Sequence, residues 1–326
     1  MDSEGWPDAA LGLVGTAVRA PSSHNTQPWA FRFRGDALLL YADRTRRLPV
    51  NDPHDRELHI SCGAALFNLR LAAAYRRLTA DVTLMPEPAD PGLLARIALV
   101  PATVQGPQRD VPLYAEIGRR RTVRSGFTAR PVPASALAAA RDAAVGEGAG
   151  LAFLEPGSAR RSAAAAVGEA GRRQFADRAW RRELASWTRP ADTGDGLTVR
   201  VPMAAAGAAR TLLRALDIGP FYGRRQGQLL RDAPAVAVIG TDGDEPRAWL
   251  IAGQALQRTL LTLTGHGLAA AFANQPCQLG GPPRTRLHDA VDGACGNRPQ
   301  LMMRIGYPRT APTAAPRRPV ADVLLP

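Results

Sequence analysis

Apolar residues recur at helical spacing in the stretch from residue 57 to residue 78. Cys62, Leu66, Leu69 and Ala73 follow one another at intervals of four, three and four residues. Side chains at these intervals lie on one face of an α-helix, so that face can be buried while the opposite face meets solvent. The pattern predicts a long amphipathic helix over this stretch.

Other stretches show helical or alternating spacing of apolar residues. Gly35 and Asp36 separate two short apolar stretches, which is typical of a β-hairpin turn. The spacing predicts helices over 9–19, 131–145, 158–187, 246–264 and 283–291, strands over 30–34, 37–42, 81–85, 151–154, 235–240 and 300–305, and a loop over 273–283.

Residues 188–232 lack a clear period and contain several glycines and prolines, including Gly194-Asp-Gly196 and Gly219-Pro-Phe-Tyr-Gly223. A structureless connection of this length is uncommon inside a compact domain. The segment is therefore predicted to be an irregular lid or insertion.

The two longest amphipathic segments resemble each other. Gly63-x-Ala65-Leu66, Leu71 and Leu78 recur 190 residues later as Gly253-x-Ala255-Leu256, Leu261 and Leu268. An offset of more than half the chain is typical of two fused homologous domains, whereas a solenoid has a short period. We therefore expect an internal pseudo-dimer, with an N-terminal half over 1–105 and a C-terminal half over 106–326.

Composition narrows the class of protein. A chain of 326 residues that is 45% hydrophobic can bury a large core. Three scattered cysteines without a Cys-x-x-Cys pair favour neither a disulfide framework nor a zinc site. The acidic N-terminal residues do not resemble a signal peptide, and no apolar run reaches the roughly 18–20 residues that span a bilayer. We expect a cytoplasmic protein without a membrane segment.

The formal net charge of +12 first suggests nucleic acid as a partner. All of the basic residues are arginine, however, and they are spread along the chain without a helix-turn-helix, zinc or stacking pattern. We therefore do not expect nucleic-acid binding.

Hydroxyl and amide side chains gather in the short stretch between Pro21 and Pro28, directly after the first predicted helix. They are Ser22, Ser23, Asn25 and Gln27. Such a stretch both donates and accepts hydrogen bonds, which suits a ligand with alternating donors and acceptors. The alternative is an ordinary polar connection between helix and strand. His24 has no metal-ligand spacing around it and is expected at the surface or at a helix cap.

A run of arginines, Arg119-Arg-Arg-Thr-Val-Arg124, precedes the helix predicted to begin near Pro131. Guanidinium groups bind phosphate oxygens through paired hydrogen bonds, so the run is a candidate phosphate site. The alternative is a solvated basic turn. No Gly-rich phosphate loop follows a predicted strand.

These two segments resemble motifs of the FMN-dependent nitroreductases. Pro21-Ser-Ser-His-Asn-Thr-Gln-Pro-Trp29 is similar to their Pro-Ser-Ser-x-Asn-x-Gln-Pro-Trp motif, and Arg120-Arg-Thr-Val-Arg124 to their Arg-Arg-Ser-x-Arg motif. Residues 299–308 resemble the last core strand of that family, and residues 317–323 its phosphate-contacting tail. The resemblance implies an α+β, nitroreductase-like fold with antiparallel-rich central sheets flanked by helices.

One departure from the family pattern is informative. Ordinary nitroreductases carry the arginine motif first and form two FMN sites in a homodimer, whereas here the order is inverted and each motif occurs once. This arrangement resembles the Acg-type subfamily, in which one chain mimics the dimer and a long segment covers the flavin. The resemblance implies one FMN per chain and a monomeric pseudo-dimer.

The resemblance also implies roles for individual residues. Arg120, Arg121, Thr122 and Arg124 would hold the FMN phosphate together with Arg317, and Ser22, Ser23, Asn25 and Gln27 would contact the flavin from the other half. Asn274, Gln275 and Pro276 align with the segment beside the flavin N5 edge, although an ordinary polar turn is an equal alternative. No catalytic side chain and no metal ligand is expected.

Three functional hypotheses follow. The first is an FMN-dependent oxidoreductase that takes hydride from NADPH or NADH and reduces a nitroaromatic, a quinone or a similar small-molecule acceptor. The second is an FMN storage or sequestration protein with little turnover, in which 188–232 closes the space for nicotinamide. The third is a basic protein that binds nucleic acid or another anionic partner without a cofactor.

Overall fold

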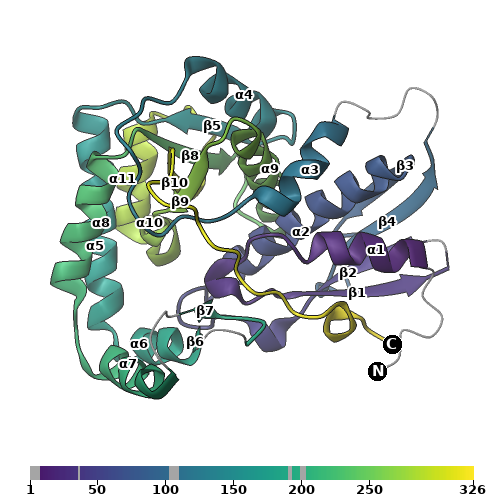
Figure 1. The fold of residues 1–326 in the computed structure, drawn as a ribbon, viewed down its shortest axis with the longest axis horizontal. Coiled ribbons are helices and arrows are strands. Elements are labelled where there is room, and N and C mark those ends of the chain that lie inside the picture. Colours follow the sequence, from purple (N-terminus) through teal and green to yellow (C-terminus); the bar gives the residue numbers. More distant parts are fainter. Residues whose placement is uncertain (1–7, 36, 103–109, 190–192, 199–202) are drawn as a thin grey trace.

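Two four-stranded antiparallel sheets organise the chain, each covered by helices (Figure 1). The computed structural model describes residues 8–35, 37–102, 110–189, 193–198 and 203–326. Among them, no helix is long and apolar enough to cross a membrane.

The first sheet has the strand order β1-β2-β4-β3. Its strands are β1 (Trp29–Arg34), β2 (Ala37–Ala42), β3 (Leu78–Leu84) and β4 (Leu93–Pro101). The predicted hairpin is confirmed, since Arg34 pairs with Ala37, although Asp36 lies outside the described residues. Strand β4 was not predicted because its sequence is an almost unbroken apolar run without alternation. It pairs with β2 on one side and β3 on the other, and Leu94, Ala95 and Ile97 are its buried residues.

The second sheet has the order β5-β8-β10-β9. Its strands are β5 (Gly150–Phe153), β8 (Ala235–Thr241), β9 (Ala269–Phe272) and β10 (Arg298–Gly306). All of β8 is buried, as is β10 after its first residue, because helices cover both faces of these strands. Strands β5, β8 and β10 lie where the apolar pattern predicts them, whereas the short edge strand β9 was not among the predicted strands.

The helices α2 (Arg56–Tyr75) and α9 (Pro246–Gly265) pack against each other between the sheets, as the apolar spacing of both segments allows. At their crossing, a Cβ on Gly63 would lie 2.2 Å from the Leu250 carbonyl oxygen, and one on Gly253 would lie 2.0 Å from the Ile60 carbonyl oxygen. Only glycine permits this approach. Positions 60 and 63 correspond to 250 and 253 at the repeat offset, so the contact is reciprocal, as in a two-fold interface.

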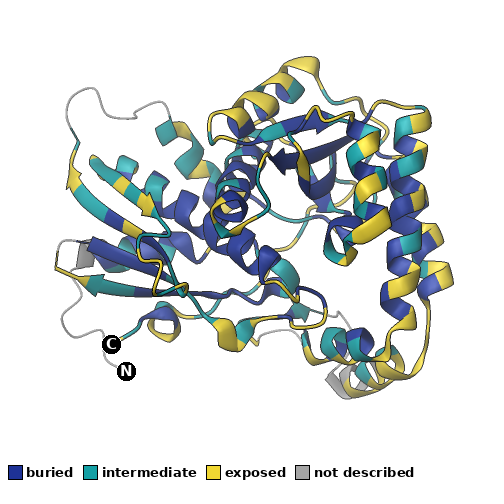
Figure 2. Cartoon of the chain, turned by 180° about the vertical axis from the view of Figure 1, so that it is seen from behind, coloured by how far each residue is buried: buried dark blue, intermediate teal, exposed yellow. Residues whose placement is uncertain are grey.

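The remaining helices flank these layers, with exposed residues on their outer faces (Figure 2). They are α1 (Asp8–Ala17), α3 (Val111–Arg119), α4 (Ala134–Val145), α5 (Ser158–Ala176), α6 (Arg178–Ser186), α7 (Met203–Ala215), α8 (Gly219–Arg231), α10 (Gln275–Leu279) and α11 (Gly281–Val291). The single helix predicted over 158–187 is therefore wrong. Asp177 is extended and its carboxylate accepts a hydrogen bond from the Ala179 N–H at 2.7 Å, which caps α6.

The prediction that 188–232 is irregular is also wrong, because α7 and α8 occupy most of it. Gly219, Gly223 and Gly227 form a stripe at four-residue spacing that packs on α5. A Cβ on Gly223 would lie 2.4 Å from the Gly168 carbonyl oxygen. These glycines allow close helix packing rather than breaking the helix. The loop predicted over 273–283 likewise contains α10, which has Pro276 in its first turn.

After β10, the C-terminal tail crosses from the second sheet to the first (Figure 1, yellow). Its end includes the short 3₁₀ helix η4 (Val320–Val323), and the Leu325 N–H donates to the Phe31 carbonyl oxygen on β1 at 2.7 Å. The tail therefore joins the two layers.

Candidate functional site

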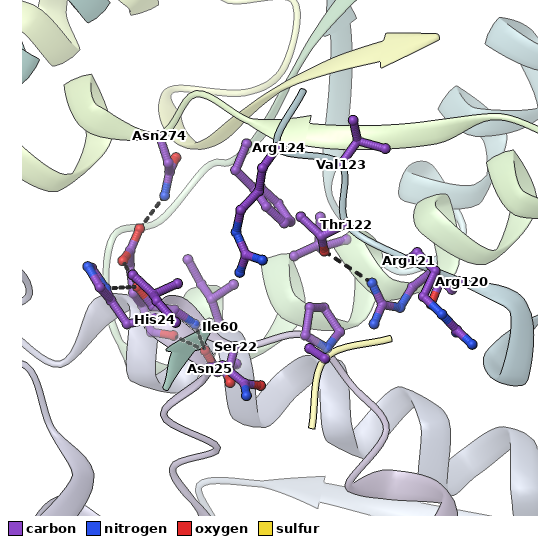
Figure 3. A pocket seen from close by; sticks show the side chains of 18 of the residues that line it. Ser22, His24, Asn25, Ile60, Arg120, Arg121, Thr122, Val123, Arg124 and Asn274 are labelled. Atoms are coloured by element: carbon purple, nitrogen blue, oxygen red, sulfur yellow. Dashed lines mark hydrogen bonds between the residues drawn. The ribbon is translucent and has the colours of Figure 1, made fainter. Parts of the chain in front are cut away.

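A cavity of about 970 Å³ lies where the two layers meet, beside the crossing of α2 and α9. One side comes from the polar loop after α1 and the start of α2, and the other from the segment after α3, from α10 and from β10. Figure 3 shows polar side chains from both sides turned toward this space. Among the described residues, no cluster of side chains is suited to a metal ion.

Ten of the twelve residues predicted for the site line this cavity. They are Ser22, Ser23, Asn25, Arg120, Arg121, Thr122, Arg124, Asn274, Gln275 and Arg317. Gln27 does not line it; its buried amide donates to the Gly194 carbonyl oxygen at 2.8 Å and accepts from the Arg318 N–H at 2.8 Å. Pro276 is buried within α10 and does not line it either.

The polar loop has an uncommon backbone. His24, Asn25 and Gln27 have φ values of 49°, 54° and 51°, in the left-handed region that few non-glycine residues adopt. The Ser22 hydroxyl accepts a hydrogen bond from the Gln27 N–H at 3.0 Å and so closes the loop. His24, expected at the surface or at a helix cap, lines the cavity. Residues held this way often cluster at ligand sites.

The arginine segment is extended and lies along the free edge of β9. The Val123 N–H donates to the Ala270 carbonyl oxygen at 2.9 Å, and Thr122 forms an isolated parallel bridge with the same residue. Val123 is buried against the sheet, whereas Arg124 points into the cavity (Figure 3). Arg120, Thr122 and Arg124 alternate with Arg121 and Val123 along this segment, and all five residues line the cavity.

Arg19, Arg120, Arg121 and Arg317 form an arginine cluster at one end of the cavity. Burial and the charges of Arg317 and Arg121 lower the pKa of Arg120 to about 9. Burial and the charges of Arg121 and Arg19 lower the pKa of Arg317 to about 10. No carboxylate within the described part of the chain pairs with this cluster, and the Nε groups of Arg120 and Arg317 are buried without an acceptor. An anion would remove this mutual repulsion.

Sequence reasoning missed Glu57, whose buried carboxylate joins the two sides of the cavity. It accepts hydrogen bonds from the Ser23 hydroxyl at 2.6 Å, from the Gln278 amide at 3.0 Å and from the Asn274 amide. Asn274 also accepts from the Met302 N–H at 3.2 Å. Glu57 thus fixes the orientation of two predicted site residues.

Three further lining residues, Arg304, Tyr222 and Phe175, were also missed. They come from β10, α8 and α5, and no local motif marks them. The Gln275 amide donates to the Tyr222 hydroxyl oxygen at 3.0 Å. Helix α8 therefore forms part of the cavity wall, although it lies in the segment predicted to be a lid.

The covering segment, residues 178–189 and 193–198, closes the cavity against the first layer. Glu183 accepts from the N–H groups of Val50 and Asn51 at 2.9 and 2.8 Å. Asp195 forms ion pairs with Arg46 and, at 3.2 Å, with Arg189. These charge-assisted contacts hold the covering segment in place.

No family model matches the sequence. Two Mycobacterium tuberculosis proteins are similar over almost their whole length. "Putative NAD(P)H nitroreductase Rv3131" is 35% identical over 330 residues, covering 98% of this chain and 92% of that protein. "Putative NAD(P)H nitroreductase acg" is 30% identical over 325 residues, covering 97% and 95%.

Solved structures with similarity include a nitroreductase with bound FMN from Desulfitobacterium hafniense, at 16% identity and a TM-score of 0.40 over 64% of this chain and 95% of that one. The FMN-dependent nitroreductase NfnB from Mycobacterium smegmatis in complex with NADPH has 20% identity and a TM-score of 0.38, over 64% and 94%.

Proposed function

Because the chain belongs to the family of the mycobacterial NAD(P)H nitroreductases that includes acg, we propose that it is an FMN-binding oxidoreductase of the nitroreductase type. NADPH or NADH would be the reductant, and a nitroaromatic, a quinone or a similar small molecule the acceptor. Bound FMN would supply the hydride chemistry, and the protein would bind and orient the reactants.

The observation that carries this proposal is that no carboxylate among the described residues pairs with the arginine cluster. Arg120 is buried without a counter-ion and lies beside further arginines, so the cluster suits a phosphate dianion. Arg120, Arg121 and Arg317 would hold it, together with Thr122 and Arg124. The buried Nε groups of Arg120 and Arg317, which lack acceptors, fit phosphate oxygens.

The opposite wall fits the rest of the cofactor. Ser22, Ser23 and Asn25 bring hydroxyl and amide groups to the cavity, and Glu57 holds Ser23 and Asn274 in fixed positions. The cavity volume of about 970 Å³ leaves room for a second reactant beside a cofactor. The covering segment would exclude water.

The purified protein should be yellow, with an absorbance band near 450 nm and about one FMN per chain. Anaerobic mixing with NADPH, and separately with NADH, should bleach that band in a stopped-flow measurement. A colourless protein that does not bind added FMN would refute the proposal. It would favour the cofactor-free hypothesis.

FMN storage is a second candidate because the covering segment is held to the first layer by Glu183 and Asp195. A closed segment would restrict access for nicotinamide while retaining FMN. In that case FMN would remain bound through gel filtration, and bleaching by either nicotinamide would take minutes or longer. Reduction within a second would exclude storage as the main role.

We further propose that residues 1–105 and 106–326 are two homologous halves related by an internal pseudo-two-fold axis. The reciprocal contacts of Gly63 with Leu250 and of Gly253 with Ile60 support this relation. The motifs that line the cavity then come one from each half, which favours a monomer with a single site. Light scattering coupled to gel filtration should give a mass near 34.7 kDa.

A further inference from the structure

Arg304 is a buried cation in the cavity wall that the second sheet forms. It lies on β10, is only 3% exposed and lines the cavity. Its Nε is buried without an acceptor, and its guanidinium forms no hydrogen bond or ion pair with another described residue. The ring of Phe127 lies 5.7 Å from the guanidinium carbon. A buried charge without a counter-ion is strongly unfavourable, so this position calls for a ligand.

The surroundings of Arg304 differ from those of the arginine cluster. Burial lowers the pKa of Arg304 and Tyr222 partly offsets this, whereas burial, Arg317 and Arg121 all lower the pKa of Arg120. Burial raises the pKa of Tyr222, and the Gln275 hydrogen bond and the nearby Arg304 offset only part of that rise, so the phenol keeps its proton at neutral pH. Strand β9 separates Arg304 from the arginine segment, since Arg304 pairs with Ala271 and Thr122 bridges to Ala270, so Arg304 is a second positive centre in the cavity.

Tyr222 and Gln275 complete a polar set around this centre. The Tyr222 oxygen accepts from the Gln275 amide at 3.0 Å, which leaves the phenol proton free to donate. The side-chain oxygen of Gln275, Oε1, is buried and accepts no hydrogen bond. Arg304 and Tyr222 thus supply two donors to an anionic oxygen pair.

Aromatic rings surround the same part of the cavity. The ring of Phe175 lies 4.8 Å from that of Tyr222 and 4.9 Å from that of Trp180, measured between centroids, and all three residues line the cavity. Such a group of rings packs well against another planar ring. The ligand that matches both features is planar and aromatic and carries an anionic group.

We propose that Arg304 and the Tyr222 hydroxyl form a second anion position in the cavity, which binds the carboxylate of a planar aromatic acid. That this acid is the electron acceptor rests on the proposed function. The anion position itself rests only on Arg304 and its surroundings. The acceptor would then be an aromatic carboxylate, such as a nitrobenzoate or a carboxylated quinone, in preference to its neutral counterpart.

Calorimetric titration of the purified full-length protein with benzoate and with benzamide tests this proposal. The two probes have similar shape and differ in charge. Benzoate should bind at least about tenfold more tightly, since hydrogen bonds to a charged group are stronger than neutral ones. Arg304→Met should bring the two affinities within about twofold. Tyr222→Phe should weaken benzoate binding about fivefold with little effect on benzamide.

Arg298→Met is the matched control, because Arg298 lies on the same strand but is exposed and outside the cavity. It should leave the benzoate preference unchanged. Arg304→Met should melt at the same temperature as the wild type or higher, because it removes an unpaired buried charge. If Arg304→Met does not fold, Tyr222→Phe tests the proposal instead, because it preserves the shape of the ring and removes only the hydroxyl.

Equal binding of benzoate and benzamide to the wild-type protein would overturn the proposal. It would also be overturned if Arg304→Met weakened FMN binding tenfold and kept the benzoate preference, because Arg304 would then serve the cofactor. A different result, the absence of flavin from the purified protein, would refute the proposed function. The calorimetric comparison does not depend on flavin.

Discussion

Arg120 is 6% exposed, yet the charged groups that act most strongly on it are other arginines. Its guanidinium donates to the Thr122 hydroxyl at 3.3 Å, and its Nε has no acceptor. The side chain is thus held in place before any ligand arrives. Preorganised donors of this kind lose little entropy on binding.

Replacement of Arg120 by alanine should weaken FMN binding by about 2–3 kcal/mol, the cost of losing charge-assisted hydrogen bonds to a phosphate. Arg124→Ala should have a similar effect. Fluorescence titration of flavin-free protein measures both. Arg119→Ala is the control, since that side chain is 69% exposed and pairs with Glu116. An Arg120→Ala variant with wild-type affinity would mean that the phosphate lies elsewhere.

Local motifs could be predicted from the sequence, and isolated site residues could not. The polar loop and the arginine run each place several residues of one type together, and most of them line the cavity. Glu57 and Arg304 stand alone in the sequence, within a helix and a strand that are both buried on almost all sides. Only the packing of α2 against α9 and the order of the second sheet bring them to the cavity. The expectation that one face of α2 meets solvent is wrong, because α9 and the first sheet cover it.

The long helices and the first hairpin were predictable because strong local periodicity agrees with the final packing. The glycines of α8 were misinterpreted because glycine usually ends helices, whereas here three of them meet α5. Strand β4 was missed because its apolar residues do not alternate, and only its pairing with β2 and β3 defines it as a strand. In both cases a tertiary contact, invisible in a local window, decides the structure.

The crossing of α2 and α9 should tolerate no side chain at its glycines. A Cβ on Gly253 would lie 2.0 Å from the Ile60 carbonyl oxygen and 2.9 Å from the Gly63 Cα. Gly253→Ala must therefore separate two buried helices. We expect a loss of about 3 kcal/mol in the free energy of unfolding, the upper end of typical overpacking costs.

Urea denaturation measures this loss, and Gly207→Ala provides the control. Gly207 lies in α7, and a Cβ at that position would have no atom within 4 Å, so alanine there should raise stability by up to about 1 kcal/mol. Gly63→Ala should cost as much as Gly253→Ala, because the contact is reciprocal. A neutral Gly253→Ala variant would contradict the close crossing.

At the scale of the whole molecule, the covering segment and the C-terminal tail both connect the two layers around the cavity. Gln27 contacts both of them, through the Gly194 carbonyl oxygen and the Arg318 N–H. Gln27, a residue of the polar loop, therefore holds the covering segment and the tail together although it does not line the cavity. Loosening the segment should therefore affect how fast a ligand leaves.

Asp195→Asn removes the charge that pairs with Arg46 and Arg189. We expect FMN to dissociate about tenfold faster, the effect of losing one charge-assisted contact in the closed state. Flavin fluorescence after dilution into excess apoflavodoxin or another flavin trap measures the rate. Asp289→Asn, at a 68% exposed side chain, should not change it. An unchanged rate for Asp195→Asn would mean that the segment does not control release.

Because the tail that passes from β10 to β1 joins the two layers, the cavity should stay intact when the protein is diluted. A site shared by two separate subunits is lost when dilution pulls the subunits apart, but here both walls belong to one polypeptide and stay at a high effective concentration. Cofactor retention should therefore be the same at nanomolar and micromolar protein. A cell could keep very few copies of this protein, and each copy would still carry an intact site.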